Sequence, residues 1–299
     1  MSAGRNVPAD FAAPPAAPPA APPAAPPAAP PAAPPAAPPA AQVMGIINCT
    51  PDSFSDGGQT LDVSAAVAAG IRMVDEGAAW LDVGGESSRP GAQAVTADEE
   101  LQRTIPVIMA LRTAGVRVPL SIDTTKEVVA RAALTAGATA INDISAGSDP
   151  AMFTLAAESG CHLILMHRQG TAQNMQVSPH YGDVVTEVIA YLAERLSAAR
   201  RAGVQDLQLF ADPGFGFGKT VAHNYELLRS LPRIHAVLGA PLVVGISRKR
   251  FLSVSAGVAY PAADQVAHPL HAIIAPWCAL LRVHDVVGTM SAVRAAGLA

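Results

Sequence analysis

The sequence predicts an α/β fold, a TIM (β/α)8 barrel over residues 43–299, preceded by a disordered Ala/Pro-rich tail over residues 1–42. Two observations predict the barrel. Eight short apolar runs alternate with longer segments of helical period, in a stretch about as long as the roughly 250 residues usual for such barrels. Nearly every apolar run also ends in charged, amide or glycine-rich residues, and barrel active sites are built at the carboxyl ends of the strands.

The N-terminal tail repeats Ala-Ala-Pro-Pro over residues 14–41 almost without interruption. Because proline lacks an amide hydrogen and has a fixed φ, this stretch is expected to form neither helix nor sheet but an extended, polyproline-like chain. Pro15 and Pro18 also fit the PxxP pattern of peptide ligands, yet no basic residue flanks them to support docking. An inert tail is therefore the preferred interpretation.

The composition narrows the classes of function. A net charge of −4 argues against a nucleic-acid partner. No apolar run approaches the roughly 20 residues of a membrane-spanning helix, and no apolar segment of a signal peptide precedes the prolines. Cys49, Cys161 and Cys278 lie far apart and form no CxxC pair, which is typical of reduced thiols. The sequence therefore predicts a cytoplasmic protein with no membrane partner.

The predicted strands are nearly continuous apolar runs, as expected for parallel strands that are covered on both faces. They cover residues 43–48, 80–83, 119–123, 140–144, 162–167, 207–212, 241–247 and 280–286. A doubly wound open sheet is the alternative fold, but the G-x-G-x-x-G turn that usually follows its first strand is missing.

The segments between these runs carry apolar residues at helical spacing. Helices are predicted over residues 64–76, 98–111, 126–136, 150–158, 184–202 and 224–231. Five of them are followed closely by a glycine, the residue that most often ends a helix in the left-handed conformation: Gly77, Gly115, Gly137, Gly160 and Gly203. Within residues 258–276, Pro269 and Pro276 are expected to break or kink a helix.

Polar residues stand at the ends of the predicted strands and are expected to gather at one rim of the barrel. They are Asn48, Asp82, Asp123, Asn142, His167, Asp212, Lys249, Arg282 and His284. Structural alternatives exist for single residues, because Asp123 can cap the following helix and Asn142 can satisfy backbone groups. Buried charges are costly unless they are paired or bind a ligand, so a whole ring of them favours a binding site.

Three loops indicate the chemistry of the ligand. Residues 48–58 form a long loop of small residues that is suited to closing over a ligand. Residues 212–219 alternate glycines with two aromatics, and Phe215 or Phe217 offers a flat wall for a planar ring. Residues 247–250 concentrate positive charge and, with Arg89, Arg282 and His284, suit phosphate oxygens. Together they predict an aromatic heterocycle beside a phosphorylated leaving group.

Other chemistries have less support. Asn48, together with phosphates of the substrate, suits Mg2+. No HExxH motif or histidine cluster suggests zinc, and no GxSxG motif is present. Cys49 has no identifiable base, so a packing role is expected for it.

The motifs, taken in order, resemble one family, the dihydropteroate synthases, over residues 43–295. They comprise residues 48–56, 82–91, 121–126, 141–144, 212–219, 247–249 and 282–285. The resemblance implies a TIM barrel that joins 4-aminobenzoate to 6-hydroxymethyl-7,8-dihydropterin diphosphate and releases diphosphate. It also implies Mg2+ as the cofactor, small-molecule substrates and a homodimer.

The resemblance implies a role for each matched residue. The pterin is expected to bind Asp82, Asp123, Asn142, Asp212, Phe217 and Lys249. The diphosphate is expected to bind Asn48, Arg89, Arg282 and His284, with Asn48 also as the Mg2+ ligand. The aminobenzoate is expected to bind Ser88, Pro90, Phe217 and Lys249.

Catalysis is expected to rest on charge stabilisation. Departure of the diphosphate leaves a cationic methylene group, and Asp123, Asp212, Lys249 and Arg89 are the residues expected to act at this step. The arylamine is nucleophilic when neutral, so no general base is assigned.

The chain departs from the family pattern in three places. Ser88 stands where many members have Thr, and Arg250 stands where some have Ser. Residues 264–276 are unlike the alanine-rich helix that is usual there, a region that contributes to the homodimer interface in the family.

Two other functions are compatible with part of the pattern. A pterin-binding methyltransferase of related architecture would not need Arg89, Arg282 and His284 together. A catalytically dead pterin-binding or interaction protein, with the tail as its working part, is disfavoured by the intact motifs at the strand ends.

Deletion of residues 1–40 tests the interpretation of the tail. Because no strand or rim residue is predicted there, turnover of the shortened chain is expected to equal that of the full chain. Steady-state kinetics of the two proteins measure this, and a large loss of turnover would show that the tail is not inert.

Overall fold

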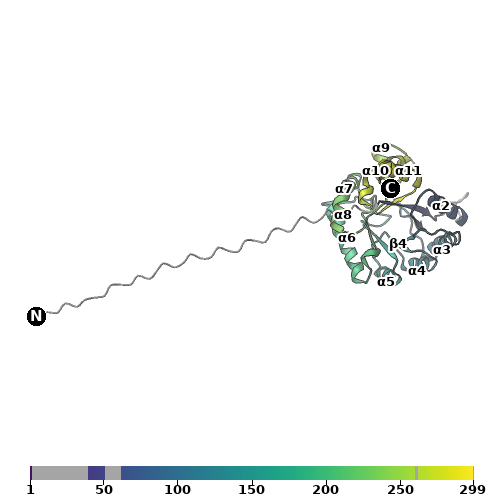
Figure 1. The fold of residues 1–299 in the computed structure, drawn as a ribbon, viewed down its shortest axis with the longest axis horizontal. Helices are drawn as coiled ribbons and strands as arrows, with labels where there is room; N and C mark the ends of the chain where they lie inside the picture. Colours follow the sequence, from purple (N-terminus) through teal and green to yellow (C-terminus); the bar gives the residue numbers. More distant parts are fainter. Residues whose placement is uncertain (2–39, 51–61, 260–261, 299) are drawn as a thin grey trace. The chain divides into compact units, whose positions relative to one another are not determined.

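The strands and helices that follow the tail form a barrel with its helices on the outside (Figure 1). A computed structural model describes residue 1 and residues 40–50, 62–259 and 262–298. The predictions for the tail and for most of the loop over residues 48–58 lie outside these ranges. The strands are β1 (Gln42–Asn48), β2 (Trp80–Gly84), β3 (Leu120–Asp123), β4 (Ala140–Asp143), β5 (His162–Met166), β6 (Leu209–Asp212), β7 (Val243–Val244) and β8 (Leu280–Val283).

All pairings between these strands are parallel, in the order β6-β5-β4-β3-β2-β1-β8-β7. A single bridge between Ala211 and Leu242 joins β6 to the segment before β7 and brings the two ends of the sheet together. The predicted TIM barrel is therefore confirmed. The predicted seventh strand was too long, because only Val243 and Val244 pair regularly and the chain leaves the sheet after them.

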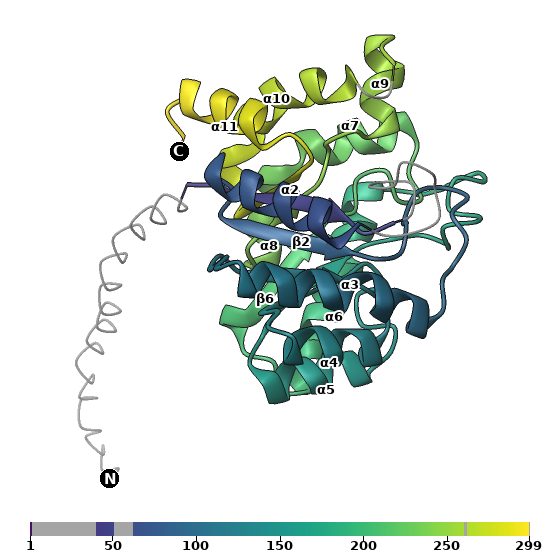
Figure 2. The same ribbon diagram turned by 90° about the vertical axis from the view of Figure 1, so that its right-hand side faces the viewer.

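The helices surround the strands, and their bounds are as follows. They are α2 (Val63–Asp75), α3 (Ala97–Thr113), α4 (Glu127–Thr135), α5 (Ala151–Ser159), α6 (Val184–Arg201), α7 (Val221–Arg229), α8 (Leu231–Leu238), α9 (Arg250–Ala256), α10 (Ala263–Ile274) and α11 (Val286–Ala295), with short 3-10 turns at Asp206–Gln208 and Ala275–Trp277. Helices α10 and α11 lie side by side (Figure 2).

The helix ends agree with the glycine pattern. Gly77, Gly115, Gly137, Gly160 and Gly203 all have positive φ at or just after a helix end, as predicted. Two other expectations need correction in part. Residues 224–231 were expected to form one helix, but they contain the junction of two helices at Ser230. The break expected in the segment with two prolines is confirmed at Pro276, where a 3-10 turn follows α10, whereas α10 continues through Pro269.

The barrel interior has an apolar floor below a polar layer. Because side chains alternate along a strand, every second residue of each strand points inward. Trp80, His162 and Phe210 begin this inner series, with ring centroids 5.2 to 5.9 Å apart. The next inward residues on β2 and β6 are Asp82 and Asp212. The floor therefore closes one end of the barrel and leaves charged groups at the other.

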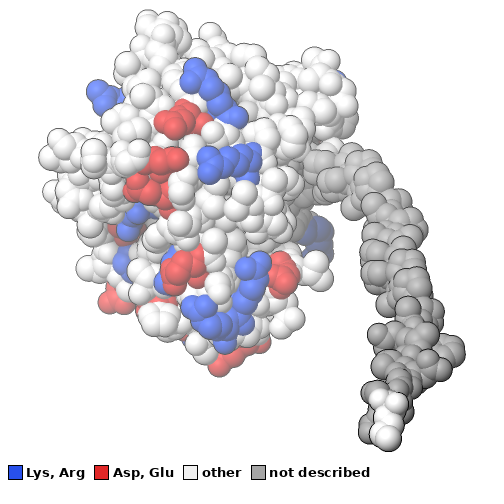
Figure 3. Space-filling view, turned by 90° about the vertical axis from the view of Figure 1, so that its left-hand side faces the viewer, with Lys and Arg blue, Asp and Glu red and all other residues white. Residues whose placement is uncertain are grey.

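One face of the molecule carries charged side chains of both signs. On the face in Figure 3, Lys and Arg side chains are interspersed with Asp and Glu. Within the described residues, no helix is long and apolar enough to cross a membrane.

Candidate active site

The centre of the candidate site is Arg282 on β8, which bridges two carboxylates on neighbouring strands. Its Nε donates to Oδ2 of Asp82 at 2.6 Å, and its Nη2 donates to Oδ2 of Asp123 at 2.8 Å. Burial raises the pKa of Asp123 to about 7, although the Arg282 guanidinium opposes the shift. Burial alone would lower the pKa of Arg282, but the two carboxylates raise it above its ordinary value, so it stays charged.

Asp123 is therefore not the cap of the following helix. The residue before α4 is Lys126, and no side chain caps that helix end. The alternative structural role considered for Asp123 is thereby excluded, and its carboxylate is held inside the barrel.

Asn142 on β4 joins the same cluster. In the register of the sheet it lies beside Asp123, and its Nδ2 donates to Oδ2 of Asp82 at 3.0 Å. The other carboxylate oxygen of Asp82, Oδ1, is buried without a hydrogen-bond partner in the described chain. A buried acceptor of this kind costs free energy unless a ligand donates to it, so it marks a binding position.

Asp212 on β6 has one oxygen engaged and one available. The backbone N–H of Gly214 donates to Oδ1 at 2.7 Å, and Oδ2 has no hydrogen bond within the described residues. Burial raises the pKa of Asp212, whereas the Gly214 hydrogen bond and Lys249 oppose the rise.

Lys249 lies over the ring of Phe217, with its Nζ 4.1 Å from the ring centroid. Burial and the charge of Arg282 lower the pKa of Lys249 to about 8. Phe215, the other aromatic considered for the wall of the site, is instead buried and stacks with Phe251. Phe217 therefore packs against the ammonium group of Lys249, whereas Phe215 belongs to the main core.

The loop after β6 needs its glycines because backbone from another loop comes close to it. Gly214 and Gly218 both have positive φ. A Cβ on Gly214 would lie 1.9 Å from the carbonyl oxygen of His167, and a Cβ on Gly218 would lie 2.4 Å from the carbonyl oxygen of Gln169. Only glycine fits at these two positions.

Lys219 and His167 support this loop through buried contacts, and no sequence pattern predicted that these two residues interact. Lys219 Nζ donates to the carbonyl oxygens of Gly214 and Phe217 at 2.9 and 3.1 Å and lies 2.9 Å from Nδ1 of His167. Burial lowers the pKa of Lys219 to about 7 and that of His167 to about 3. The lysine of the Gly-Phe-Gly-Lys motif therefore supports Phe217 and does not face the mouth.

His284 lies just beyond β8. Its Nδ1 is 2.9 Å from Oγ of Ser247, and its backbone N–H donates to the same oxygen at 3.1 Å. Burial, with the charges of Arg248 and Arg282, lowers the pKa of His284 to about 3. Its partner Ser247 also bonds Asp264, a contact between distant segments that no local sequence pattern reveals.

The remaining predicted residues lie at the rim. Asn48 ends β1 opposite Gly84 and is partly buried. Ser88 is partly buried, whereas Arg89 and Pro90 are exposed in the loop between β2 and α3. Arg89 is close enough to contribute to the lowered pKa of Lys249, after the larger effects of burial and Arg282.

Cys49 does not act as a nucleophile in this geometry. The side chain is fully buried, and burial raises the pKa of its thiol to about 12. A protonated, inaccessible thiol is unreactive, which supports the packing role expected for it. Cys49, Cys161 and Cys278 are all free thiols.

Comparison with known proteins links this site to one family. The profile of the family described as pterin binding enzyme matches residues 44–284. The dihydropteroate synthase of Escherichia coli (strain K12) is 44% identical over 264 residues, which cover 84% of this chain and 89% of that protein.

Two solved structures are similar in fold and sequence. Dihydropteroate synthase of Xanthomonas albilineans with 4-aminobenzoic acid has a TM-score of 0.80 and 46% identity, with 86% of this chain and 92% of that chain covered. The same enzyme with 7,8-dihydropteroate has a TM-score of 0.76 and 43% identity, with the same coverage.

Replacement of Arg282 by Met tests whether the buried ion pairs hold the site together. The variant leaves two buried carboxylates unpaired, so the free energy of unfolding is expected to fall by about 3 to 5 kcal/mol at about pH 8. Without the guanidinium, the pKa of folded Asp123 rises further above its unfolded value. Protonation below about pH 7 then relieves the penalty, and the deficit shrinks as the pH falls.

Urea unfolding at about pH 8 and pH 5 measures this difference. Arg131→Met is the matched control, because Arg131 pairs with Glu127 on the surface and its loss is expected to cost less than about 1 kcal/mol. A deficit as small as that of the control, or equal at both pH values, would contradict the prediction.

Proposed function

Because this chain belongs to the dihydropteroate synthase family of pterin-binding enzymes, we propose a role for each polar group at the barrel mouth. The chain joins 6-hydroxymethyl-7,8-dihydropterin diphosphate to 4-aminobenzoate in folate biosynthesis, and the products are 7,8-dihydropteroate and diphosphate. The observation that carries the assignment is the cluster of Asp82, Asp123 and Arg282 with an unpartnered acceptor on Asp82.

The pterin occupies the inner part of the mouth. Asp123, Asn142 and Asp212 offer acceptors and an amide to the ring nitrogens and oxo group, and Asp82 adds its unpartnered Oδ1. A planar heterocycle with several N–H donors satisfies buried acceptors that otherwise lack partners. Phe217 and Lys249 border this position, where the ring is an apolar wall and the ammonium is a donor.

The diphosphate is bound by Arg89, Arg282, His284 and Asn48. Arg282 is already engaged by two carboxylates, so its contribution to the leaving group is mainly the field of a fixed charge. Arg89 and His284 reach the same end from two different loops. The guanidinium of Arg89 donates to the outer phosphate oxygens, and the neutral His284 ring accepts from a phosphate oxygen that retains a proton.

The donor set at this end also suits Mg2+. Among the described residues, no group of three or more His, Cys, Asp or Glu forms a cage of protein ligands for a metal. An ion held by the amide oxygen of Asn48 and by substrate phosphates needs no such cage. When bound, it neutralises charge that develops on the departing diphosphate.

The aminobenzoate lies against Ser88, Pro90, Phe217 and Lys249. Departure of the diphosphate leaves a cationic methylene group, which the neighbouring carboxylates Asp123 and Asp212 stabilise. The neutral arylamine then attacks this carbon, and the C–N bond forms as the amine loses its proton to solvent. Lys249 orients the two substrates, and Arg89 stabilises the leaving group.

The location and assembly of the chain complete the proposal. The free thiols fit a reducing cytoplasm. The homodimer rests on the family resemblance, and Ile273 and Trp277 leave apolar area exposed around the end of α10, where a second copy is able to pack.

A reaction with both substrates tests the activity directly. Purified protein, pterin diphosphate, 4-aminobenzoate and Mg2+ are expected to give dihydropteroate and diphosphate in equal amounts, measured by mass spectrometry and a diphosphate assay. Omission of 4-aminobenzoate is the control and should abolish the pteroate. Absence of pteroate from the complete mixture would refute the assignment.

Asp212→Asn tests the pterin position. The amide still accepts the hydrogen bond of Gly214 but removes a charged acceptor, so affinity for the pterin substrate is expected to fall about tenfold or more. Calorimetry measures it, with Asp206→Asn as the control because that carboxylate is three-quarters exposed and pairs only with Arg200. Equal affinity of the Asp212 variant and the wild type would mean that Asp212 lies outside the pterin site.

A further inference from the structure

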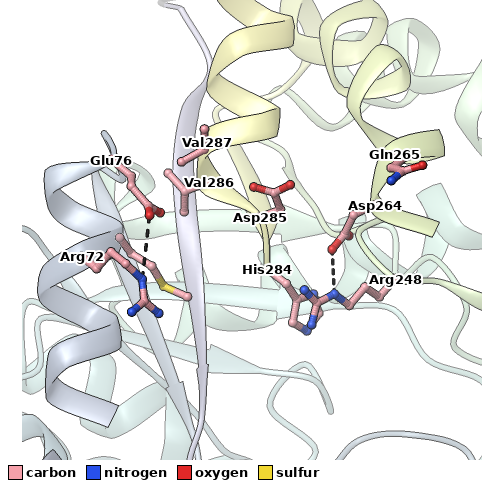
Figure 4. Close-up of a pocket in the computed structure, with 10 residues that line it drawn as sticks. Arg72, Glu76, Arg248, Asp264, Gln265, His284, Asp285, Val286 and Val287 are labelled. Atoms are coloured by element: carbon pink, nitrogen blue, oxygen red, sulfur yellow. Dashed lines mark hydrogen bonds and ion pairs between the residues drawn. The ribbon is translucent and has the colours of Figure 1, made fainter. Parts of the chain in front are cut away.

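A chain of hydrogen bonds runs from Asp264 on α10 to His284 behind the mouth of the barrel. The Ser247 hydroxyl lies 2.6 Å from Oδ1 of Asp264 and 2.9 Å from Nδ1 of His284. The second carboxylate oxygen of Asp264 accepts from Nε of Arg248, also at 2.6 Å. Figure 4 shows Asp264 above Arg248 with the His284 ring beside them. Asp264 therefore stands behind one of the residues that bind the diphosphate.

The direction of these hydrogen bonds follows from proton counting. Burial works against ionisation of Asp264, but the bonds from Ser247 and Arg248 lower its pKa below the usual value, so it is an acceptor only. The single Ser247 proton must then point to Asp264. The Ser247 oxygen has only lone pairs left for the backbone N–H and for Nδ1 of His284. Nδ1 must therefore carry the proton in this arrangement.

The other ring nitrogen of His284 is left for a ligand. Nε2 has no hydrogen bond within the described residues, because the bonds of this residue are made by its Nδ1 and its backbone N–H. Burial and the nearby arginines keep the ring neutral, so Nε2 carries a lone pair before a ligand binds. A diphosphate oxygen that retains a proton is able to donate it to this nitrogen.

The turn that carries Arg248 has support besides the ion pair. Arg248 has a φ of 53°, in the left-handed region that is unfavourable for a residue with a Cβ. The backbone N–H of Lys249 donates to the carbonyl oxygen of Ile246 at 3.3 Å and closes this turn. The position of Ser247 in the turn therefore does not depend on the ion pair alone.

We propose that Asp264 is a positioning residue, which acts through Ser247 to fix the tautomer and orientation of His284 so that Nε2 faces the leaving diphosphate. The proposal rests on the proposed role of His284 in diphosphate binding. It also assigns a role to Asp264, a residue within the segment that departs from the alanine-rich family pattern. The carboxylate here acts like the oriented outer partner of a ligand-binding histidine.

Nitrogen NMR of histidine-labelled full-length protein tests the tautomer without substrate. In the wild type, His284 is expected to show a protonated Nδ1 and an unprotonated Nε2, with His284→Gln used to assign the signals. In Asp264→Ala the Ser247 hydroxyl is free to donate to Nδ1, so the protonated nitrogen is expected to become Nε2. An unchanged tautomer in Asp264→Ala would overturn the proposal.

Arg248→Met separates this role from simple charge balance. It removes the ion pair of Asp264 but keeps the Ser247 contact, so the His284 tautomer is expected to remain that of the wild type. Ser247→Ala is expected to remove the tautomer preference, and Ser247→Thr, which keeps the hydroxyl, to restore it. If Arg248→Met changes the tautomer as Asp264→Ala does, the carboxylate acts through Arg248 and the proposal fails.

Inorganic diphosphate, tested with Mg2+ by calorimetry, gives the functional readout. Asp264→Ala and Ser247→Ala are expected to bind it about tenfold more weakly than the wild type, with the KM for 4-aminobenzoate unchanged. Should the Asp264 variant fail to fold by circular dichroism, Ser247→Ala and its Thr counterpart decide the question. A wild type that does not bind diphosphate refutes the proposed function, whereas equal binding by wild type and variants refutes only the positioning role.

Discussion

The double ion pair of Arg282 with Asp82 and Asp123 is the constraint on which the site depends. Two carboxylates on adjacent strands, each almost without contact with water, are expensive to bury without a cation between them. The guanidinium uses separate nitrogens for the two oxygens, so it also fixes how the carboxylates face each other. The remaining oxygen of Asp82, Oδ1, is buried without a hydrogen-bond partner in the described residues, so a ligand that donates to it completes the pairing.

This arrangement requires the apolar floor beneath it. Trp80 lies two residues before Asp82 on β2, and Phe210 lies two residues before Asp212 on β6, so the same strand faces supply both layers. The rings exclude water from one side of the carboxylates, which strengthens the field of every charge above them. The raised pKa of Asp123 and the lowered pKa of Lys249 are two consequences of the same desolvation. A substrate that carries hydrogen-bond donors and an anionic end is complementary to the Asp123 carboxylate and to the Lys249 ammonium group.

Local sequence patterns predict the strands of the barrel and the polar residues at the strand ends. The apolar runs and the polar residue that ends each run follow from strand burial, so the sequence alone predicts Asp82, Asp123 and Asn142 at one rim of the barrel. Contacts between distant segments leave no such signal. Lys219 ends the glycine motif after β6, and its ammonium group turns inward to carbonyl oxygens. Asp264 lies on α10, and its carboxylate accepts from Ser247, which is distant in sequence. Even Pro269 misleads, because a helix tolerates a proline when tertiary packing supports it.

Lys219 and Lys249 are both buried near the mouth of the barrel, but their side chains make different contacts. Lys219 donates to two carbonyl oxygens and to a neutral His167, so its proton donors are used by the protein itself. Lys249 has the ring of Phe217 beneath it, and its ammonium group has no hydrogen bond within the described residues. Lys219 thus stabilises the glycine loop that positions the Phe217 ring, and Lys249 packs over that ring. Under the proposed function, the motif residues form two layers, one that contacts the substrates and one that holds the first in place. Asp264 and Ser247 belong to the second layer under the positioning role proposed for them at His284.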